Sequence, residues 1–122
     1  MSTASFFYVV RCAFVDRKAM EGFLAWLRAC HVADVCSAGA EDAEIFVLDP
    51  LAGDHPHAVE IRYRFASREA FGRYEREAAP RLRQDGIDEL AHLGVAGSDV
   101  AFTRTTSERV DWQRDQAAAR AR

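Results

Sequence analysis

One segment of the chain changes its hydrophobic period in a single step, and this feature constrains the fold more than any other. Between Ala58 and Phe65 apolar residues occupy alternate positions, which is the pattern of a half-buried strand. Beyond Ser67, a predicted helix N-cap, they recur at helical spacing. These helical positions are Phe71, Tyr74, Ala78 and Leu82. A strand therefore leads directly into a helix, and residues 6–15 and 17–31 repeat this arrangement near the start of the chain.

The remaining segments supply two more strands and extend the two helices. The first helix, capped by Asp16, is expected to bury one apolar stripe and then to fray into a turn across residues 33–39. Its stripe consists of Met20, Phe23, Leu24, Leu27 and His31. Strands are expected at residues 43–48 and 99–106, and Pro80 is expected to break the second helix or restart it. The stripe of that second helix continues through Leu82, Ile87, Leu90 and Leu93.

The order β-α-β-β-α-β predicts an α+β fold of the ferredoxin-like type. Two right-handed β-α-β units, each splitting a strand pair, give an antiparallel four-stranded sheet with both helices on one face. A length of 122 residues fits one domain. We assign residues 1–106 to this domain and residues 107–122 to a C-terminal tail, in which Trp112 is the single large apolar anchor.

Charge and composition exclude several classes of partner. A net charge of −3 gives no electrostatic reason to expect nucleic acid or an anionic membrane surface. No apolar run has the length of a membrane span, and the N-terminus lacks the basic start of a signal peptide. Three cysteines without C-x-x-C spacing argue against a disulfide framework, so we expect a reducing, cytoplasmic compartment.

The usual cofactor and metal motifs are missing from the sequence. It has no Gly-rich phosphate loop, no H-E-x-x-H and no G-x-S-x-G, and we expect neither a cofactor nor a metal ion. His55 and His57 flank a proline without carboxylate or thiolate company, which is a weak metal signal. Cys30 and Cys36 lie on either side of His31, and they are either redox-active or small buried hydrophobic residues.

The second face of the sheet needs a cover. The first strand is apolar on that face too, whereas the strand at residues 58–65 offers Glu60, Arg62 and Arg64 there. This mixture is too apolar for water in one place and too charged for a dry core in another. A second copy of the sheet would let apolar residues pack and charged residues pair across the interface, so we predict a homodimer formed through the open sheet face.

A pattern spread along the chain is similar to that of a known family. The first helix ends near a tryptophan, which is followed by His and later by Val. A strand ends in aromatic residues before Ser, and the helix after it contains Tyr and an Ala-Pro-x-x-Arg motif. The last strand contains Arg. The matches are Trp26, His31, Val35, Tyr63, Phe65, Tyr74, Ala79, Pro80, Arg83 and Arg104. From about Phe6 to Thr106 the chain resembles an uncharacterised bacterial family of the dimeric α+β barrel superfamily, although Ala33 stands where that family usually has proline. The resemblance implies a dimeric barrel but no particular activity, because the superfamily includes cofactor-free monooxygenases, haem enzymes, isomerases and ligand-binding domains.

Five residues are candidates for a ligand site. His31 ends the first helical stripe, as a hydrogen-bonded core residue or as a ligand or acid–base group. Arg104 faces the helices, where its guanidinium must pair with a protein carboxylate or an anionic ligand. Tyr63 and Tyr74 lie on core-facing stripes and either fill space or offer hydroxyls, and Trp26 flanks the first stripe. We expect His31, Tyr74 and Arg104 to converge between sheet and helices.

Three functions fit these residues. In the first, the space between sheet and helices binds a small molecule, apolar with an acidic or carbonyl group. In the second, the same space belongs to a cofactor-independent monooxygenase or an isomerase, with His31 as general base and Arg104 holding an enolate or phenolate. In the third, side chains fill the space and the protein is a dimeric interaction module without a ligand.

Overall fold

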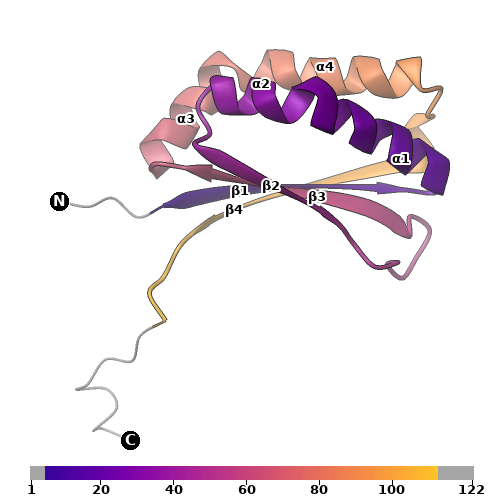
Figure 1. Cartoon of the computed structure of the whole chain (residues 1–122), viewed down its shortest axis with the longest axis horizontal. Coiled ribbons are helices and arrows are strands. Elements are labelled where there is room, and N and C mark those ends of the chain that lie inside the picture. The colour runs from indigo at the N-terminus through magenta and orange to yellow at the C-terminus, as the bar shows by residue number, and fades with distance from the viewer. Residues whose placement is uncertain (1–4, 113–122) are drawn as a thin grey trace, which may run out of the picture.

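The computed structural model describes residues 5–112, which form two layers, a sheet and a cover of helices on one of its faces (Figure 1). The four strands are β1 (Phe6–Phe14), β2 (Asp42–Val47), β3 (His57–Phe65) and β4 (Val100–Glu108). Their order in the sheet is β2-β3-β1-β4, and every neighbouring pair is antiparallel. This is the predicted ferredoxin-like order, with β1 and β3 at the centre.

The helices form two segments that lie side by side over the sheet (Figure 1). The first comprises α1 (Arg17–Trp26), a π-helical turn η1 (Leu27–His31) and α2 (Val32–Ser37). The second comprises α3 (Arg68–Glu77) and α4 (Ala79–His92), and a short 3-10 turn, η2 (Gly97–Asp99), precedes β4. Both predicted N-caps are confirmed, since the Asp16 carboxylate accepts a hydrogen bond from the Lys18 N–H and the Ser67 hydroxyl accepts one from the Ala70 N–H.

The turn predicted across residues 33–39 is wrong for most of its length, because helical backbone continues to Ser37. The π-helical turn explains the difference. It widens the helix by one residue per turn and shifts the apolar period, so that Val35 faces the core and is fully buried. A pattern read at a constant helical period does not register this shift.

The predicted break in the second helical segment is confirmed. The chain leaves helical geometry at Ala78, and α4 starts again with Pro80 in its first turn, where the missing N–H costs no hydrogen bond. Gly94 ends the segment with a φ of +72°, a conformation that favours glycine. The predicted apolar stripe holds at Leu82 and Leu90, which are buried, but it is wrong at Ile87 and Leu93, which are 57% and 36% exposed.

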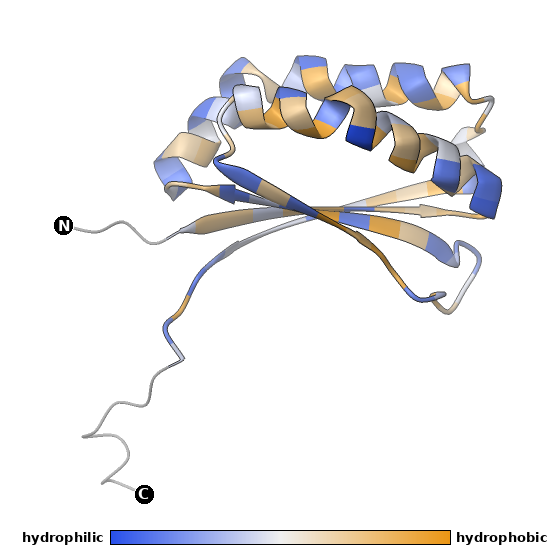
Figure 2. Ribbon diagram, in the orientation of Figure 1, coloured by the Kyte–Doolittle hydropathy of each residue, from blue (hydrophilic) through white to orange (hydrophobic). Residues whose placement is uncertain are grey.

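The core lies between the sheet and the helices. Alternate side chains of β1 and β3 enter it, among them Phe6, Phe14, Ile61 and Phe65, each at most 1% exposed. Figure 2 shows apolar and polar residues interspersed along both the strands and the helices, as expected for elements that each bury one face. Burial of these large apolar side chains stabilises the two-layer arrangement.

The opposite face of the sheet has no helix on it (Figure 1). Glu60 is nevertheless only 6% exposed, because Arg11 and Arg62 enclose its carboxylate. Arg64 pairs with Glu41. The charged row that was predicted to pair between subunits is thus already paired within one chain, and the apolar residues on this face still lack a cover.

Strand β4 continues two residues beyond the predicted end at Thr106, with Ser107 and Glu108 opposite the first residues of β1. The segment after it carries Val110, 84% exposed, and Trp112, 89% exposed. Trp112 therefore does not pack against the other residues of the described range, 5–112. The rest of the predicted tail, residues 113–122, lies outside the described residues.

Candidate functional site

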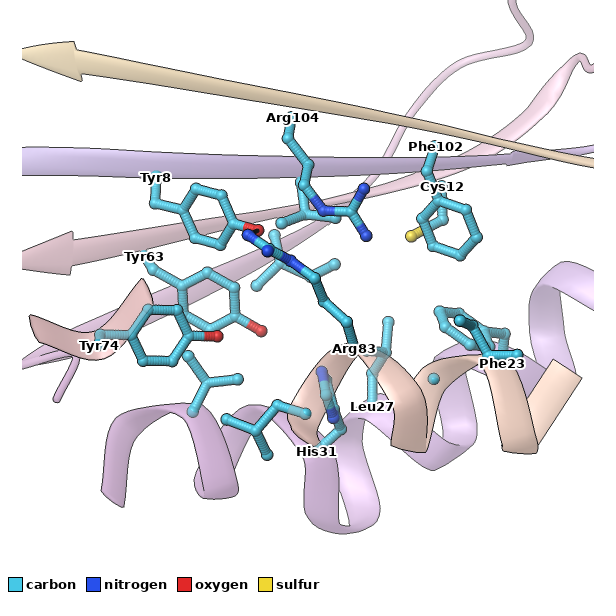
Figure 3. Close-up of a pocket in the computed structure, with 16 residues that line it drawn as sticks. Tyr8, Cys12, Phe23, Leu27, His31, Tyr63, Tyr74, Arg83, Phe102 and Arg104 are labelled. Carbon is cyan, nitrogen blue, oxygen red and sulfur yellow. Dashed lines mark hydrogen bonds between the residues drawn. The ribbon is translucent and has the colours of Figure 1, made fainter. Parts of the chain in front are cut away.

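A cavity of about 400 Å³ lies between the sheet and the helices. Side chains from the three strands β1, β3 and β4 line one side of it, and side chains from both helical segments line the other (Figure 3). The lining is mainly apolar, with polar groups at a few points. Such a volume and composition are typical of small-molecule sites.

Four of the five candidate residues reach this cavity. His31, Tyr63, Tyr74 and Arg104 line it, from four different elements, and their polar ends point into the same space (Figure 3). Trp26 does not line it. The Trp26 indole stacks instead on the His31 ring, with 4.4 Å between centroids, so it supports the imidazole from behind. Whether these residues hold a ligand stays a prediction.

His31 owes its position to the π-helical turn that it ends. Turns of this kind often mark functional sites, because they redirect a side chain that a regular helix would place elsewhere. The Nδ1 atom of His31 is buried and has no hydrogen-bond partner among residues 5–112. Burial lowers the pKa of His31, an effect that Asp34 and Asp85 oppose, so the ring is neutral near pH 7 and able to accept a proton.

Tyrosines form one wall of the cavity. The rings of Tyr8 and Tyr63 are stacked with centroids 6.0 Å apart, and Tyr74 packs beside them. Burial raises the pKa of Tyr74 to about 12 and that of Tyr63 further in the same direction. Both hydroxyls therefore stay protonated at neutral pH and can donate a hydrogen bond to a ligand.

Arg104 is an exposed cation at the edge of the cavity. It lies opposite Val10 in the sheet, and its guanidinium lies 5.4 Å from the centre of the Phe102 ring on the same strand. Within residues 5–112 it makes no ion pair with a carboxylate. Of the two partners expected for this arginine, a protein carboxylate or an anionic ligand, the part of the chain that the structure describes provides no carboxylate.

Arg83 is a cavity residue that was not among the sequence candidates. Its guanidinium pairs with Glu75 at 2.5 Å and donates a longer hydrogen bond of 3.4 Å to the Tyr8 hydroxyl. Its Nε atom is buried and lacks a partner among the described residues. Gly86, three residues later in α4, also lines the cavity. A glycine inside a helix costs helix stability, and this one was the signal in the sequence that something approaches the helix there.

The three cysteines have different surroundings. Cys12 is buried and lines the cavity, and burial raises the pKa of its thiol to about 12, so it is not a thiolate at neutral pH. Cys30 is exposed, and its thiol lies 3.6 Å from the Trp26 carbonyl. Cys36 is half-buried, and burial also raises its pKa. High pKa values favour the structural interpretation of Cys12 and Cys36 over a redox role.

The histidine pair around Pro56 is separated in the structure. His55 interacts with the carbonyl of Ser98 at 2.9 Å, whereas His57 begins β3. Across residues 5–112, no three His, Cys, Asp or Glu side chains gather closely enough to hold a metal ion. No helix in the described part of the chain has the length and apolar character needed to span a membrane.

Comparisons with known proteins show the fold. No family model and no curated protein matches the chain. A dimeric ferredoxin-like protein from an uncultured marine organism is similar in structure, with 14% identity, a TM-score of 0.65 and coverage of 88% of this chain and 97% of that one. SnoaB, a cofactor-independent oxygenase from Streptomyces nogalater, has 11% identity, a TM-score of 0.51 and coverage of 92% and 100%. A dimeric ferredoxin-like protein of unknown function from Thermobifida fusca has 8% identity, a TM-score of 0.52 and coverage of 84% and 91%.

The chain therefore has a ferredoxin-like α+β fold, as the sequence pattern predicted. Proteins of this fold include an oxygenase and proteins without a known function. Function has to be argued from the cavity, because a shared fold at such identities carries none.

Proposed function

We propose that the protein binds a small organic molecule in the cavity between the sheet and the helices. The observation that carries this proposal is the cavity itself, about 400 Å³ with a mainly apolar lining and a few converging polar groups. Tyr63 and Tyr74 would donate hydrogen bonds to the ligand, and Arg104 would supply charge. The third hypothesis, an interaction module, required a space filled by side chains, and the open cavity weighs against it.

A ligand screen tests this function. We expect thermal-shift screening of a library of small organic compounds to give hits that raise the melting temperature, because a ligand that binds only the folded state stabilises it. Arg104→Met should lose the acidic hits, whereas Arg73→Met, a charge change on the exposed side of α3 and outside the cavity, should retain them. A library that yields no compound bound in the cavity would contradict the proposal.

His31 favours one alternative, an enzyme that transfers a proton. His31 lines the same cavity as Arg104, and its buried Nδ1 atom has no partner among the described residues. A neutral imidazole there can take a proton from an acidic C–H or O–H group, while a guanidinium holds the resulting oxyanion. Return of the proton to another carbon would make the protein an isomerase, and reaction of the anion with O₂ would make it a cofactor-independent oxygenase. Incubation of the screening hits in air, followed by mass spectrometry, separates an enzyme from a binding protein.

We further propose a homodimer formed through the open face of the sheet. The apolar residues of β1 on that face, Phe7 and Val9, are half-buried, and no helix or strand among residues 5–112 covers them. The related fold occurs in proteins described as dimeric. Interfaces of this kind usually bury more than about 2,000 Å² in total. Light scattering at micromolar concentration should give about twice the chain mass of 13.7 kDa, and a monomer at that concentration would overturn the proposal.

A further inference from the structure

Two arginines enter the cavity from opposite sides. Arg83 extends from α4 and Arg104 from β4, and both side chains lie in the space between sheet and helices, with the guanidinium of Arg83 beside the Tyr8 hydroxyl and that of Arg104 near Phe102 (Figure 3). They are far apart in the sequence, and only the fold brings them to one space. Two cations that share a cavity repel each other unless negative charge is placed between them.

The described residues balance only one of these two charges. The Nη2 atom of Arg83 pairs with the carboxylate of Glu75, and the Glu75 side chain is 35% exposed. No Asp or Glu lines the cavity, and Arg104 has no carboxylate partner among residues 5–112. The cavity wall therefore carries an excess positive charge.

Several hydrogen-bond donors line the cavity, and one of them has no acceptor among the described residues. The buried Nε atom of Arg83 has no acceptor within the described residues, and leaving such a donor unpaired costs free energy. The hydroxyls of Tyr63 and Tyr74 are further donors, since burial raises the pKa of each and keeps it protonated. An acceptor that bears negative charge satisfies this set better than a neutral one.

The remaining lining suits a flat apolar body. The stacked rings of Tyr8 and Tyr63 form one wall, and Phe23 and Phe102 face each other nearby, with centroids 6.2 Å apart and the rings edge to face. Aromatic rings pack favourably against such walls.

From these observations we infer that the ligand is the anionic form of a planar aromatic acid, with its charged oxygen between Arg83 and Arg104. This inference rests on the proposed small-molecule binding and specifies its ligand class. The charged group is an oxygen that has lost a proton, as in a carboxylate or a phenolate. Arg83 thereby becomes a ligand-binding residue and Glu75 the group that orients it.

Matched pairs of probes test the inference. The probes are 2-naphthoate with 2-naphthamide, and indole-3-carboxylate with indole-3-carboxamide, which keep the ring and change the charge. A third acid, 2-naphthol, tests whether a phenolate binds, when it is added to the protein at a pH above the pKa of its hydroxyl group. Calorimetric titration of the full chain should show each carboxylate binding at least about tenfold more tightly than its amide, because charge-assisted hydrogen bonds are the stronger ones.

Three variants assign the effect to the arginines. Arg104→Met and Arg83→Met should each weaken carboxylate binding by about tenfold or more and leave amide binding unchanged. Arg73→Met, which removes the same charge outside the cavity, should change neither. Arg104 lies exposed on an edge strand, so Arg104→Met is expected to fold and carries the test even if Arg83→Met does not.

The outcomes separate this inference from the proposed function. Equal affinity for acids and amides, or an Arg104→Met variant that binds carboxylates like the wild type, overturns the inference while small-molecule binding stands. If none of the aromatic acids binds but the library screen gives neutral compounds that bind, the inference is also overturned while small-molecule binding stands. If neither these probes nor the library contains a compound that binds in the cavity, the proposed function falls and the inference with it.

Discussion

Val10→Trp is expected to abolish ligand binding while the protein still folds. Val10 lines the cavity from the central strand β1, opposite Ile61 on one side and Arg104 on the other. A tryptophan there extends into the open space and occupies the place of the ligand. We expect an affinity loss of at least about 100-fold, since an occupied cavity leaves the ligand no apolar contacts. The free energy of unfolding should change by no more than about 1 kcal/mol, because the added ring fills space rather than overpacking a closed core.

The neighbouring residue supplies the matched control. Val9 lies on the same strand, but its side chain is on the open face of the sheet, next to Arg11, Glu60 and the threonines of β4. Val9→Trp should leave the affinity for the ligand unchanged and alter the mass measured by light scattering, if the open face forms the dimer. Calorimetric titration of both variants with a hit from the screen gives the answer. Wild-type affinity in Val10→Trp would mean that the ligand binds elsewhere.

The layer structure could be predicted because its signals are local and strong. Alternation in Val59, Ile61 and Tyr63 and helical spacing after Ser67 each specify an element, and the handedness of β-α-β units leaves few ways to connect them. The π-helical turn could not be predicted in this way. It inserts one residue into the helical period, and no residue in the segment from Leu27 to His31 announces it.

Only part of the candidate site could be predicted from local patterns. His31 and Arg104 could be identified as candidates because each is a polar residue on an otherwise apolar face. Arg83 lies beside the apolar stripe of its helix, and an arginine in that place normally extends into water. The helix that carries it restarts at Pro80 and packs beside the first helical segment, and the Arg83 side chain lines the cavity below them. Such a combination depends on the packing of two helices, which a single sequence does not encode in any simple spacing.

For the charged residues on the open face, the sequence predicted the wrong pairing partners. The sequence placed Glu60, Arg62 and Arg64 on one face and assigned their pairing to a partner chain. It could not show that Arg11 on the next strand stands opposite Glu60 in the register, nor that Glu41 reaches Arg64. Both carboxylates are therefore occupied within the chain, and an interface on this face would receive a preformed, hydrogen-bonded cluster rather than free charges.

Among substitutions on the open face of the sheet, Glu60→Leu is expected to cause the largest loss of stability. The Oε1 atom of Glu60 accepts hydrogen bonds from Nε and Nη2 of Arg11 at 3.2 and 3.0 Å, and its Oε2 atom accepts one from Nε of Arg62 at 2.8 Å. Leucine preserves the bulk but leaves two guanidinium groups side by side. We expect the free energy of unfolding to fall by about 2 kcal/mol, less than for a fully buried pair, because both arginines are partly in water and remain hydrated. Urea unfolding measures this change.

Glu44→Leu is the control for charge. Glu44 is an exposed residue of β2, and in the sheet it lies opposite Arg62 of β3. Replacing Glu44 by leucine therefore makes the same change in net charge on the same sheet as Glu60→Leu. It should cost well under 1 kcal/mol, because exposed charges on a protein surface contribute little to stability. Equal losses in the two variants would show that the Glu60 cluster contributes no more than a surface charge.

The pH dependence of the same pair of variants tests the cause. Burial alone would raise the pKa of Glu60, but hydrogen bonds from Arg62 and Arg11 outweigh it and hold the pKa below its ordinary value. The folded state then binds fewer protons than the unfolded state, so the stabilisation is complete above the ordinary pKa of a glutamate and is lost as the pH falls through the lowered one. The gap in stability between wild type and Glu60→Leu should therefore narrow below about pH 4.3. If the open face also forms the dimer, Glu60→Leu places uncompensated arginines from two chains against each other, and the dimer should dissociate at concentrations where Glu44→Leu remains paired.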